Sequence, residues 1–288
     1  MKKFVKLSLV IAFAVFTFNI FAQNSNYPFE VKISGKGERS IIFIPGFACS
    51  GEVWNETKVS YEKDYTCYTL TMAGFADVPA QDNSTFQNWE NAIATYIQEN
   101  KINKPIVIGH SMGGGLAMAL AADFPELVSK IIVVDALPCL AALMNPAFKT
   151  KENNNCSAVV SQMPSMTDEQ FYQMQKSTMP RLLADTSKIE IVVGWSVASD
   201  RTTFTNMYCD FSNIDLREKI INIKCPSLIL LESYFVNFKP AISEQFKNLT
   251  SAQLQYATKG LHFIMYDDKE WYDNQLSNFI VQYTGNEF

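Results

Sequence analysis

The chain has 288 residues, a net charge of −5 at neutral pH, 48% hydrophobic residues and 18% charged residues. This balance is that of an ordinary globular protein and excludes disordered and fibrous proteins. The length favours one large α/β domain with an insertion over two independent domains. No basic run is present, so we expect neither nucleic acid nor an anionic membrane surface as a partner.

The first 22 residues differ in composition from the rest of the chain. Three lysines precede an almost continuously apolar stretch over residues 7–21, and Ala22 precedes a polar run. The apolar stretch is shorter than the roughly 20 residues that a membrane-spanning helix needs. We therefore predict a signal peptide over residues 1–22 and a periplasmic or secreted bacterial protein, without stable membrane insertion after cleavage. Loss of the three lysines leaves 21 basic against 29 acidic residues, a net charge of about −8.

After this leader, short apolar runs of the β type alternate with helical patterns. Such alternation is typical of a parallel sheet covered by helices on both faces. The expected strands cover residues 40–44, 65–70, 106–108 and 131–134, and the expected helices cover residues 85–100 and 111–123.

The alternation stops after residue 136 and resumes near residue 226. Strands are expected again over residues 226–231 and 254–257, followed by a closing helix over residues 269–283. The intervening pattern is helical and loop-like. We predict a core made of residues 23–136 and 224–288, with a helical cap, or lid, inserted over residues 137–223.

Cysteine and histidine are too few and too scattered to indicate a metal site. The chain has six cysteines without a Cys-x-x-Cys pair and two histidines, so a metal site is not expected. Cys139, Cys156 and Cys209 fall in the predicted cap. An oxidising compartment would permit a disulfide there, but the spacing does not determine the pairing.

The sequence Gly109-His110-Ser111-Met112-Gly113 fits the Gly-x-Ser-x-Gly nucleophile elbow. An apolar strand is predicted just before it and a helix rich in small residues just after it. A serine on such a sharp strand-to-helix turn stands clear of the sheet, and the flanking glycines relieve the crowding that the turn creates. The helix N-terminus also favours negative charge that develops beside the serine. Ser111 is therefore the candidate nucleophile.

The elbow and the alternating pattern together resemble the α/β-hydrolase superfamily, over roughly residues 31–288. The resemblance implies the α/β-hydrolase fold, with a mostly parallel, doubly wound sheet and an inserted helical cap. It also implies a catalytic serine, acid and histidine in that order along the chain.

His262 is the candidate general base. A histidine near neutrality can accept the serine proton and return it to the leaving group. His262 lies after the last predicted strand, where the superfamily places its base. By the same resemblance, His110 is a packing or hydrogen-bonding residue of the elbow.

The acid of the triad remains open. Most members of the superfamily place it shortly after the strand that follows the cap, but residues 231–236 hold no aspartate, and Phe235 is near the usual acid position. A minority use the end of the strand before the cap, where this chain has Asp135. We favour Asp135, with Glu232 as the alternative acid and Asp210 as a third candidate. The acid would fix the tautomer of the histidine and stabilise its imidazolium.

Two backbone amides are expected to form the oxyanion hole. One belongs to Met112, directly after the nucleophile, and the other to Phe47, in the loop after the first long predicted strand. Relatives usually carry His-Gly in this loop, where this chain has Pro45-Gly46. Only the backbone is required, so the amide of Phe47 can still donate.

The predicted cap is rich in methionine and aromatic residues. One interpretation is a lid over an apolar acyl or alcohol pocket, and the other is ordinary core packing between cap and sheet. Arg201 could bind a substrate carboxylate, although a surface ion pair with a neighbouring acid is favoured.

Together these residues predict a serine hydrolase of a small or medium, apolar ester that acts through an acyl-enzyme. This mechanism needs no metal and no organic cofactor. The same triad would serve an iminopeptidase-like amide or peptide hydrolase, a lactonase or a thioesterase. A rival from another class is a non-catalytic binding protein on a hydrolase scaffold. The partner expected is a small-molecule substrate, and the sequence leaves the oligomeric state open.

Overall fold

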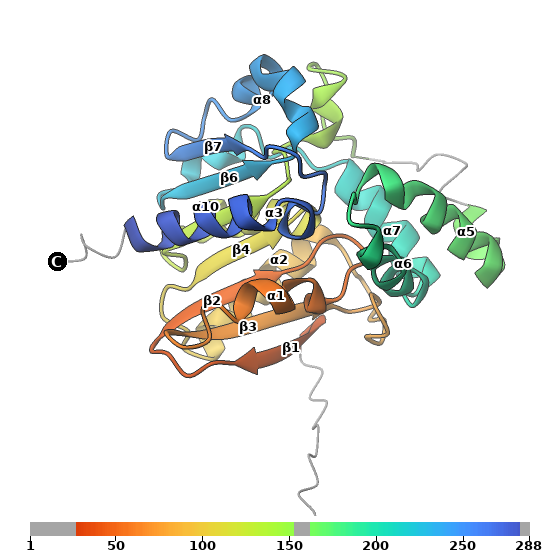
Figure 1. Ribbon diagram of the computed structural model, residues 1–288, viewed down its shortest axis with the longest axis horizontal. Helices are drawn as coiled ribbons and strands as arrows, with labels where there is room; N and C mark the ends of the chain where they lie inside the picture. The colour runs from red at the N-terminus through yellow and green to blue at the C-terminus, as the bar shows by residue number, and fades with distance from the viewer. Residues whose placement is uncertain (1–26, 153–161, 283–288) are drawn as a thin grey trace, which may run out of the picture.

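The computed structural model describes residues 27–152 and 162–282. Within them, seven strands form one sheet in the order β1-β3-β2-β4-β5-β6-β7 (Figure 1). β1 runs antiparallel to β3, and the other neighbours pair in parallel. The strands are β1 Phe29–Ser34, β2 Arg39–Ile44, β3 Tyr65–Met72, β4 Ile106–His110, β5 Lys130–Val134, β6 Ser227–Leu231 and β7 Ala252–Tyr256. The predicted mostly parallel sheet is confirmed.

Helices cover both faces of this sheet, and alternate side chains of each strand point to opposite faces. In β2, Ile42 and Ile44 belong to a hydrophobic cluster with residues of α2, α3 and α8, whereas Ile41 and Phe43 belong to a second cluster with residues of α9 and α10. The helices of the core are α1 Asn55–Lys58, α2 Phe86–Glu99, α3 Met112–Asp123, α8 Lys239–Gln245, α9 Ile264–Asp267 and α10 Lys269–Gln282. This is the predicted doubly wound architecture.

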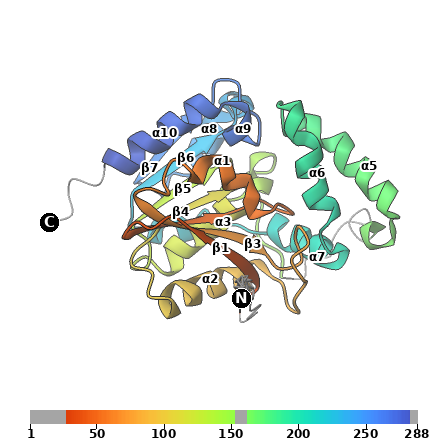
Figure 2. The same ribbon diagram turned by 60° about the horizontal axis from the view of Figure 1, so that its bottom comes forward.

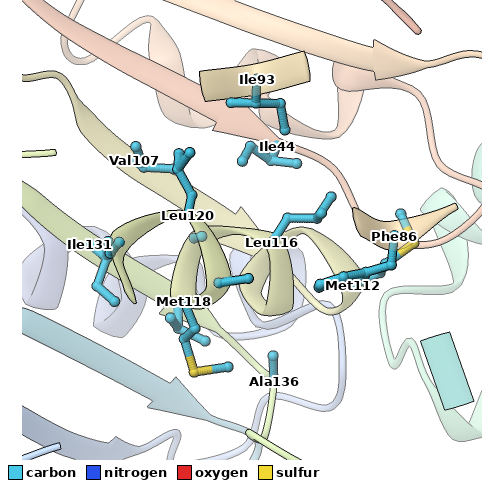
Figure 3. Packing of buried hydrophobic residues seen from close by; sticks show 14 of the residues in the cluster. Ile44, Phe86, Ile93, Val107, Met112, Leu116, Met118, Leu120, Ile131 and Ala136 are labelled. Atoms are coloured by element: carbon cyan, nitrogen blue, oxygen red, sulfur yellow. The ribbon is translucent and has the colours of Figure 1, made fainter. Parts of the chain in front are cut away.

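The helix α3 lies at the centre of the larger hydrophobic cluster (Figure 3). Its small residues let it approach the sheet closely, and every residue from Met112 to Ala122 is buried. Leu116 and Leu120 lie among Ile44, Ile93 and Val107 in this cluster. Burying each such side chain contributes about 2 kcal/mol, so α3 is held firmly against the strands.

The predicted strands and helices of the core begin and end within two residues of their expected bounds. Thr85 caps α2, its hydroxyl accepting the amide of Asn88, and Asn100 ends the helix. β1 was not predicted, although its residues Phe-Glu-Val-Lys-Ile-Ser alternate apolar and polar as expected for a half-exposed strand.

The predicted signal peptide, residues 1–22, and Cys156 lie outside the described residues. None of the helices in residues 27–152 and 162–282 is long and apolar enough to cross a bilayer. Cys209 is bonded in a disulfide. Cys139 is a buried free thiol, as are Cys49, Cys67 and Cys225.

Between β5 and β6 the chain forms α5 Asp168–Thr178, α6 Ile189–Val197 and α7 Arg201–Ser212. These helices, here called the insertion helices, stand beside the sheet rather than on either of its faces (Figure 2). A capping box at Thr167 starts α5, and the Asp200 carboxylate accepts the amide of Thr203 to start α7. These two caps satisfy N-terminal amides of α5 and α7 with side chains of the insertion itself.

The insertion helices are tied to the core along two edges. On one edge, the amide of Asp200 donates to the carbonyl of Gly74, and the amide of Ala76 donates to the hydroxyl of Ser199. On the other edge, the carboxylate of Asp267 accepts the amides of residues 184 and 185. The two edges leave a covered space between the insertion helices and the ends of the strands.

The turn from β4 into α3 depends on glycine. A Cβ on Gly109 would lie 2.0 Å from the carbonyl oxygen of Gly113, and a Cβ on Gly113 would lie 2.3 Å from that of Ile44. Both obstacles are backbone atoms, so no side-chain rotation can relieve them. The strand and the helix can approach this closely only without side chains at these positions.

We therefore expect Gly109→Ala to lower the free energy of unfolding by at least about 3 kcal/mol, because the added methyl overpacks a rigid turn. Gly194→Ala is the matched control. Gly194 lies exposed in α6 with no atom within 4 Å of its added Cβ, so alanine should stabilise the protein by about 0.5–1 kcal/mol. Urea denaturation measures both, and equal stability of Gly109→Ala and wild type would contradict the prediction.

Candidate active site

Ser111 occupies the sharp turn between β4 and α3. Its backbone has φ 52° and ψ −120°, a region that a residue with a side chain rarely adopts and that costs about 1–3 kcal/mol. The amide of Ser111 donates to the carbonyl of Val134 at 2.8 Å, which holds the turn to the end of β5. Such stored strain is characteristic of functional sites.

Asp135 follows β5 and is also in a left-handed conformation, with φ 52°. Its amide donates to the carbonyl of Leu230 at 2.7 Å, and its side chain is buried. The carboxylate has two partners: Oδ2 lies 2.6 Å from Nδ1 of His262, and Oδ1 accepts the amide of Glu232 at 2.7 Å. A carboxylate can only accept, so Nδ1 of His262 carries the proton and Nε2 remains available as the basic atom.

The pKa of His262 is raised above its ordinary value. Burial acts to lower the pKa of His262, but the hydrogen bond that Nδ1 donates to Asp135, the charge of Asp135 and the charge of Glu232 together raise it by more. These groups therefore favour the imidazolium, which is the state that a general base reaches after it accepts a proton.

The side chains of the two other candidate acids are not hydrogen-bonded to His262. The side chain of Asp210 accepts the amide of Phe86 at 2.6 Å and thereby caps α2. Glu232 lies at the end of β6, where its backbone amide, not its carboxylate, binds Asp135. Among the residues that the structure describes, Asp135 is the carboxylate that hydrogen-bonds to His262.

The loop that holds the candidate oxyanion donor Phe47 lies against the elbow. A Cβ on Gly46 would lie 2.8 Å from Nδ1 of His110 and 3.3 Å from Cβ of Ser111, so glycine is needed for this close approach. The second candidate donor, Met112, is the first residue of α3. The first amides of a helix have no acceptor within the helix and point away from its end. β2 and β4 are neighbours, so the two donors come from adjacent loops.

His110 contacts the loop that carries His262. Its side chain is buried, and its Nε2 lies 2.9 Å from the carbonyl oxygen of His262. Burial and the neighbouring His262 hold the pKa of His110 well below its ordinary value. A neutral His110 can donate to that carbonyl and fix the loop that carries His262, consistent with the predicted hydrogen-bonding role.

A cavity of about 510 Å³ opens above these residues. Ser111, His262, Glu232 and Phe47 line it from the core. Its other wall comes from the segment between β5 and β6 and includes Leu140, Gln175, Met179, Arg181, Leu182, Val192, Ser196, Phe204, Tyr208, Phe211 and Ser212. The cavity is therefore largely apolar, with the candidate nucleophile and base in its wall.

The methionine and aromatic residues of the insertion divide between the two interpretations, lid over a pocket and core packing. Of its methionines, Met179 lines the cavity, whereas Met163 and Met207 are buried in the core and Met144 is 82% exposed. Arg201 pairs with Asp168 at 2.8 Å, as the ion-pair interpretation predicted, although the partner is not its neighbour in sequence.

Two residues of the cavity wall, Phe235 and Arg181, could not be recognised from the sequence as binding residues. Phe235 was noted only because it occupies the usual position of the acid, and the structure turns it into the cavity wall. Arg181 follows Pro180 in a short turn between α5 and α6, and only the fold brings it to the cavity. In residues 27–152 and 162–282, no three histidine, cysteine or acidic side chains are grouped to hold a metal ion.

The chain matches a known protein family and is similar to several curated proteins. A family model described as alpha/beta hydrolase fold matches residues 39–186. The chain is 24% identical to a pimeloyl-[acyl-carrier protein] methyl ester esterase of Vibrio parahaemolyticus over 193 residues, covering 66% of this chain and 73% of the relative. It is 25% identical to the esterase of the same name from Vibrio atlanticus, covering 69% and 76%.

Solved structures share the fold at lower identity. The enol-lactonase from Burkholderia xenovorans LB400 superimposes with a TM-score of 0.73 at 14% identity, covering 88% of this chain and 96% of that one. An esterase from Exiguobacterium antarcticum gives a TM-score of 0.71 at 18% identity, covering 88% and 95%. At these identities the likeness concerns the fold.

The pairing of His262 with Asp135 predicts that Asp135→Asn lowers kcat by about four orders of magnitude, because an amide favours the wrong histidine tautomer. Asp210→Asn is the matched control and should keep kcat within a few-fold, since Asp210 accepts the amide of Phe86 and does not bind His262. Steady-state kinetics on a p-nitrophenyl ester, with circular dichroism to check folding, measures both. A larger loss in Asp210→Asn than in Asp135→Asn would reverse the assignment.

Proposed function

The chain belongs to the α/β-hydrolase family, and from this premise we propose that it is a serine hydrolase that cleaves a small or medium, apolar ester. The observation that carries the proposal is the 2.6 Å hydrogen bond between Asp135 and His262, at a cavity that also holds the strained Ser111. A buried acid, an oriented imidazole and a serine in one cavity are the parts that acyl transfer requires.

In the proposed mechanism, Oγ of Ser111 attacks the ester carbonyl while Nε2 of His262 accepts the hydroxyl proton. The amides of Phe47 and Met112 donate to the oxyanion of the tetrahedral intermediate. His262 then protonates the leaving alcohol, which departs and leaves an ester on Ser111. A water molecule, deprotonated by His262, attacks this acyl-enzyme, releases the carboxylic acid and restores the serine.

The cavity supports an apolar substrate. Its volume of about 510 Å³ is within the usual range for small-molecule sites, and aliphatic and aromatic side chains make most of its wall. The pimeloyl-[acyl-carrier protein] methyl ester esterases among its relatives support an ester as the bond cleaved. Amides, lactones and thioesters would meet the same nucleophile, so the cavity rather than the triad selects among them.

We expect the purified protein to hydrolyse p-nitrophenyl esters and to prefer acyl chains that fit the cavity over both acetyl and long-chain esters. Ser111→Ala and His262→Ala should each lower kcat by at least about 10⁴-fold, because nucleophile and base act as one unit. A fluorophosphonate probe should label wild type and leave Ser111→Ala unlabelled. Failure of wild type to react with ester or probe would favour the binding-protein alternative.

We further propose export, supported by the basic and apolar composition of residues 1–22 and by the disulfide at Cys209. Expression of the full sequence in a bacterial host should give a periplasmic or secreted protein whose intact mass lacks residues 1–22. Ala22→Arg is the control, because a large charged residue at the cut should block cleavage. Recovery of the uncleaved chain from the cytoplasm would contradict the proposal.

A further inference from the structure

A second carboxyl group, that of Glu232, faces the candidate active site. Glu232 follows β6, and its side chain lines the cavity that also holds Ser111 and His262. The neighbouring amide of Ser233 donates to the carbonyl of Gly260 at 2.9 Å, which places this strand end beside the loop that carries His262. Glu232 is therefore in the cavity wall, at a strand end that is hydrogen-bonded to the loop that carries His262.

The structural contact of Glu232 is made by its backbone amide and not by its side chain. The amide of Glu232 donates to Oδ1 of Asp135, and any residue except proline could supply that bond. Within the described part of the chain, its carboxylate has no hydrogen-bond donor. A half-buried carboxylate without a partner is costly, so packing alone does not explain a glutamate here.

The pKa of the Glu232 carboxyl responds to burial and to the charges beside it. Burial, together with the charge of Asp135, raises the pKa of Glu232 to about 7, although His262 acts to lower it. Glu232 therefore exchanges its proton near neutrality, in the same range in which a histidine base works.

We propose that Glu232 is a positioning residue of the site, whose negative charge stabilises the imidazolium that forms when His262 accepts the proton of Ser111. Glu232 does not touch the reacting atoms and acts through His262. The inference rests on the proposed hydrolase function and adds to the triad a second carboxylate that acts on His262 by its charge.

Other ionisable groups around His262 do not replace this charge. Asp135 already binds Nδ1, and His110, packed 4.7 Å away between ring centroids, is held neutral. Arg181 and Tyr208 line the cavity from the insertion side, and a cation there would oppose the imidazolium rather than stabilise it. Glu232 is thus the carboxyl group other than Asp135 that lines the cavity.

The first test is a direct titration of His262 in Glu232→Gln, which keeps the backbone amide and the side-chain shape. The chain has only two histidines, so the ring protons of a tag-free sample can be assigned by NMR with a His262→Ala reference. We expect Glu232→Gln to lower the pKa of His262 by about one unit, and Glu232→Asp, which keeps the charge, to restore most of it. An unchanged His262 titration in Glu232→Gln would overturn the inference.

The second test is the pH dependence of kcat/KM for a p-nitrophenyl ester. Its acid limb reports the base of the free enzyme and should move to lower pH by the same amount in Glu232→Gln. A uniform loss at every pH, without movement of the limb, would indicate a merely structural role. Wild type that titrates as predicted but neither hydrolyses esters nor reacts with the fluorophosphonate probe would overturn the hydrolase function while leaving the electrostatic coupling measured.

Stability supplies a third readout that does not depend on activity. A carboxyl whose pKa is raised from 4.5 to about 7 on folding binds its proton more tightly in the folded state, so wild type loses stability as pH rises through this interval. Glutamine does not ionise, so the Glu232→Gln variant does not lose stability in this way. Glu232→Gln should therefore melt at the same temperature as wild type at pH 4.5 but about 3 °C or more higher at pH 8. A variant less stable than wild type at both pH values would contradict a buried, unpaired charge.

Discussion

The candidate active site depends on backbone hydrogen bonds that continue past the ends of three parallel strands. The amide of Ser111 donates to the carbonyl of Val134, and the amide of Asp135 donates to that of Leu230. Each bond joins the first residue after one strand to one of the last two residues of the neighbouring strand. Since parallel strands end at the same edge of the sheet, the candidate nucleophile and the candidate acid are positioned by the same hydrogen bonds that hold the core together.

Two of these residues are strained in the same way. Ser111 and Asp135 both have φ near 52°, and both lie directly after a buried parallel strand. The left-handed backbone turns each side chain away from the strand direction and toward the cavity. The surrounding ladder and the packing of α3 supply the stability that offsets these conformations. Rigid support of this kind keeps catalytic groups within a small distance of their working positions.

Much of the core follows from the sequence because apolar periodicity and the elbow are local patterns. Residues 106–123 show it best, with a buried strand, a serine between glycines and a helix of small residues. The acid is different, because Val134-Asp135-Ala136 looks like any strand end. Its role depends on a left-handed turn and on the return of His262 from the far end of the chain, neither of which is encoded locally. Arg181 and Phe235 reach the cavity through tertiary packing, which periodicity cannot reveal either.

The two tied edges of the insertion helices determine how molecules enter and leave. Swinging these helices away as a rigid lid would break the bonds at Gly74 and at Asp267 together. Passage depends instead on exposed side chains along the cavity, such as Leu140 and Tyr208. Exposed side chains change rotamer in picoseconds to nanoseconds, whereas domain closure takes microseconds to milliseconds. Opening a path to this cavity therefore requires rotamer changes of a few exposed side chains and no movement of the insertion helices as a body.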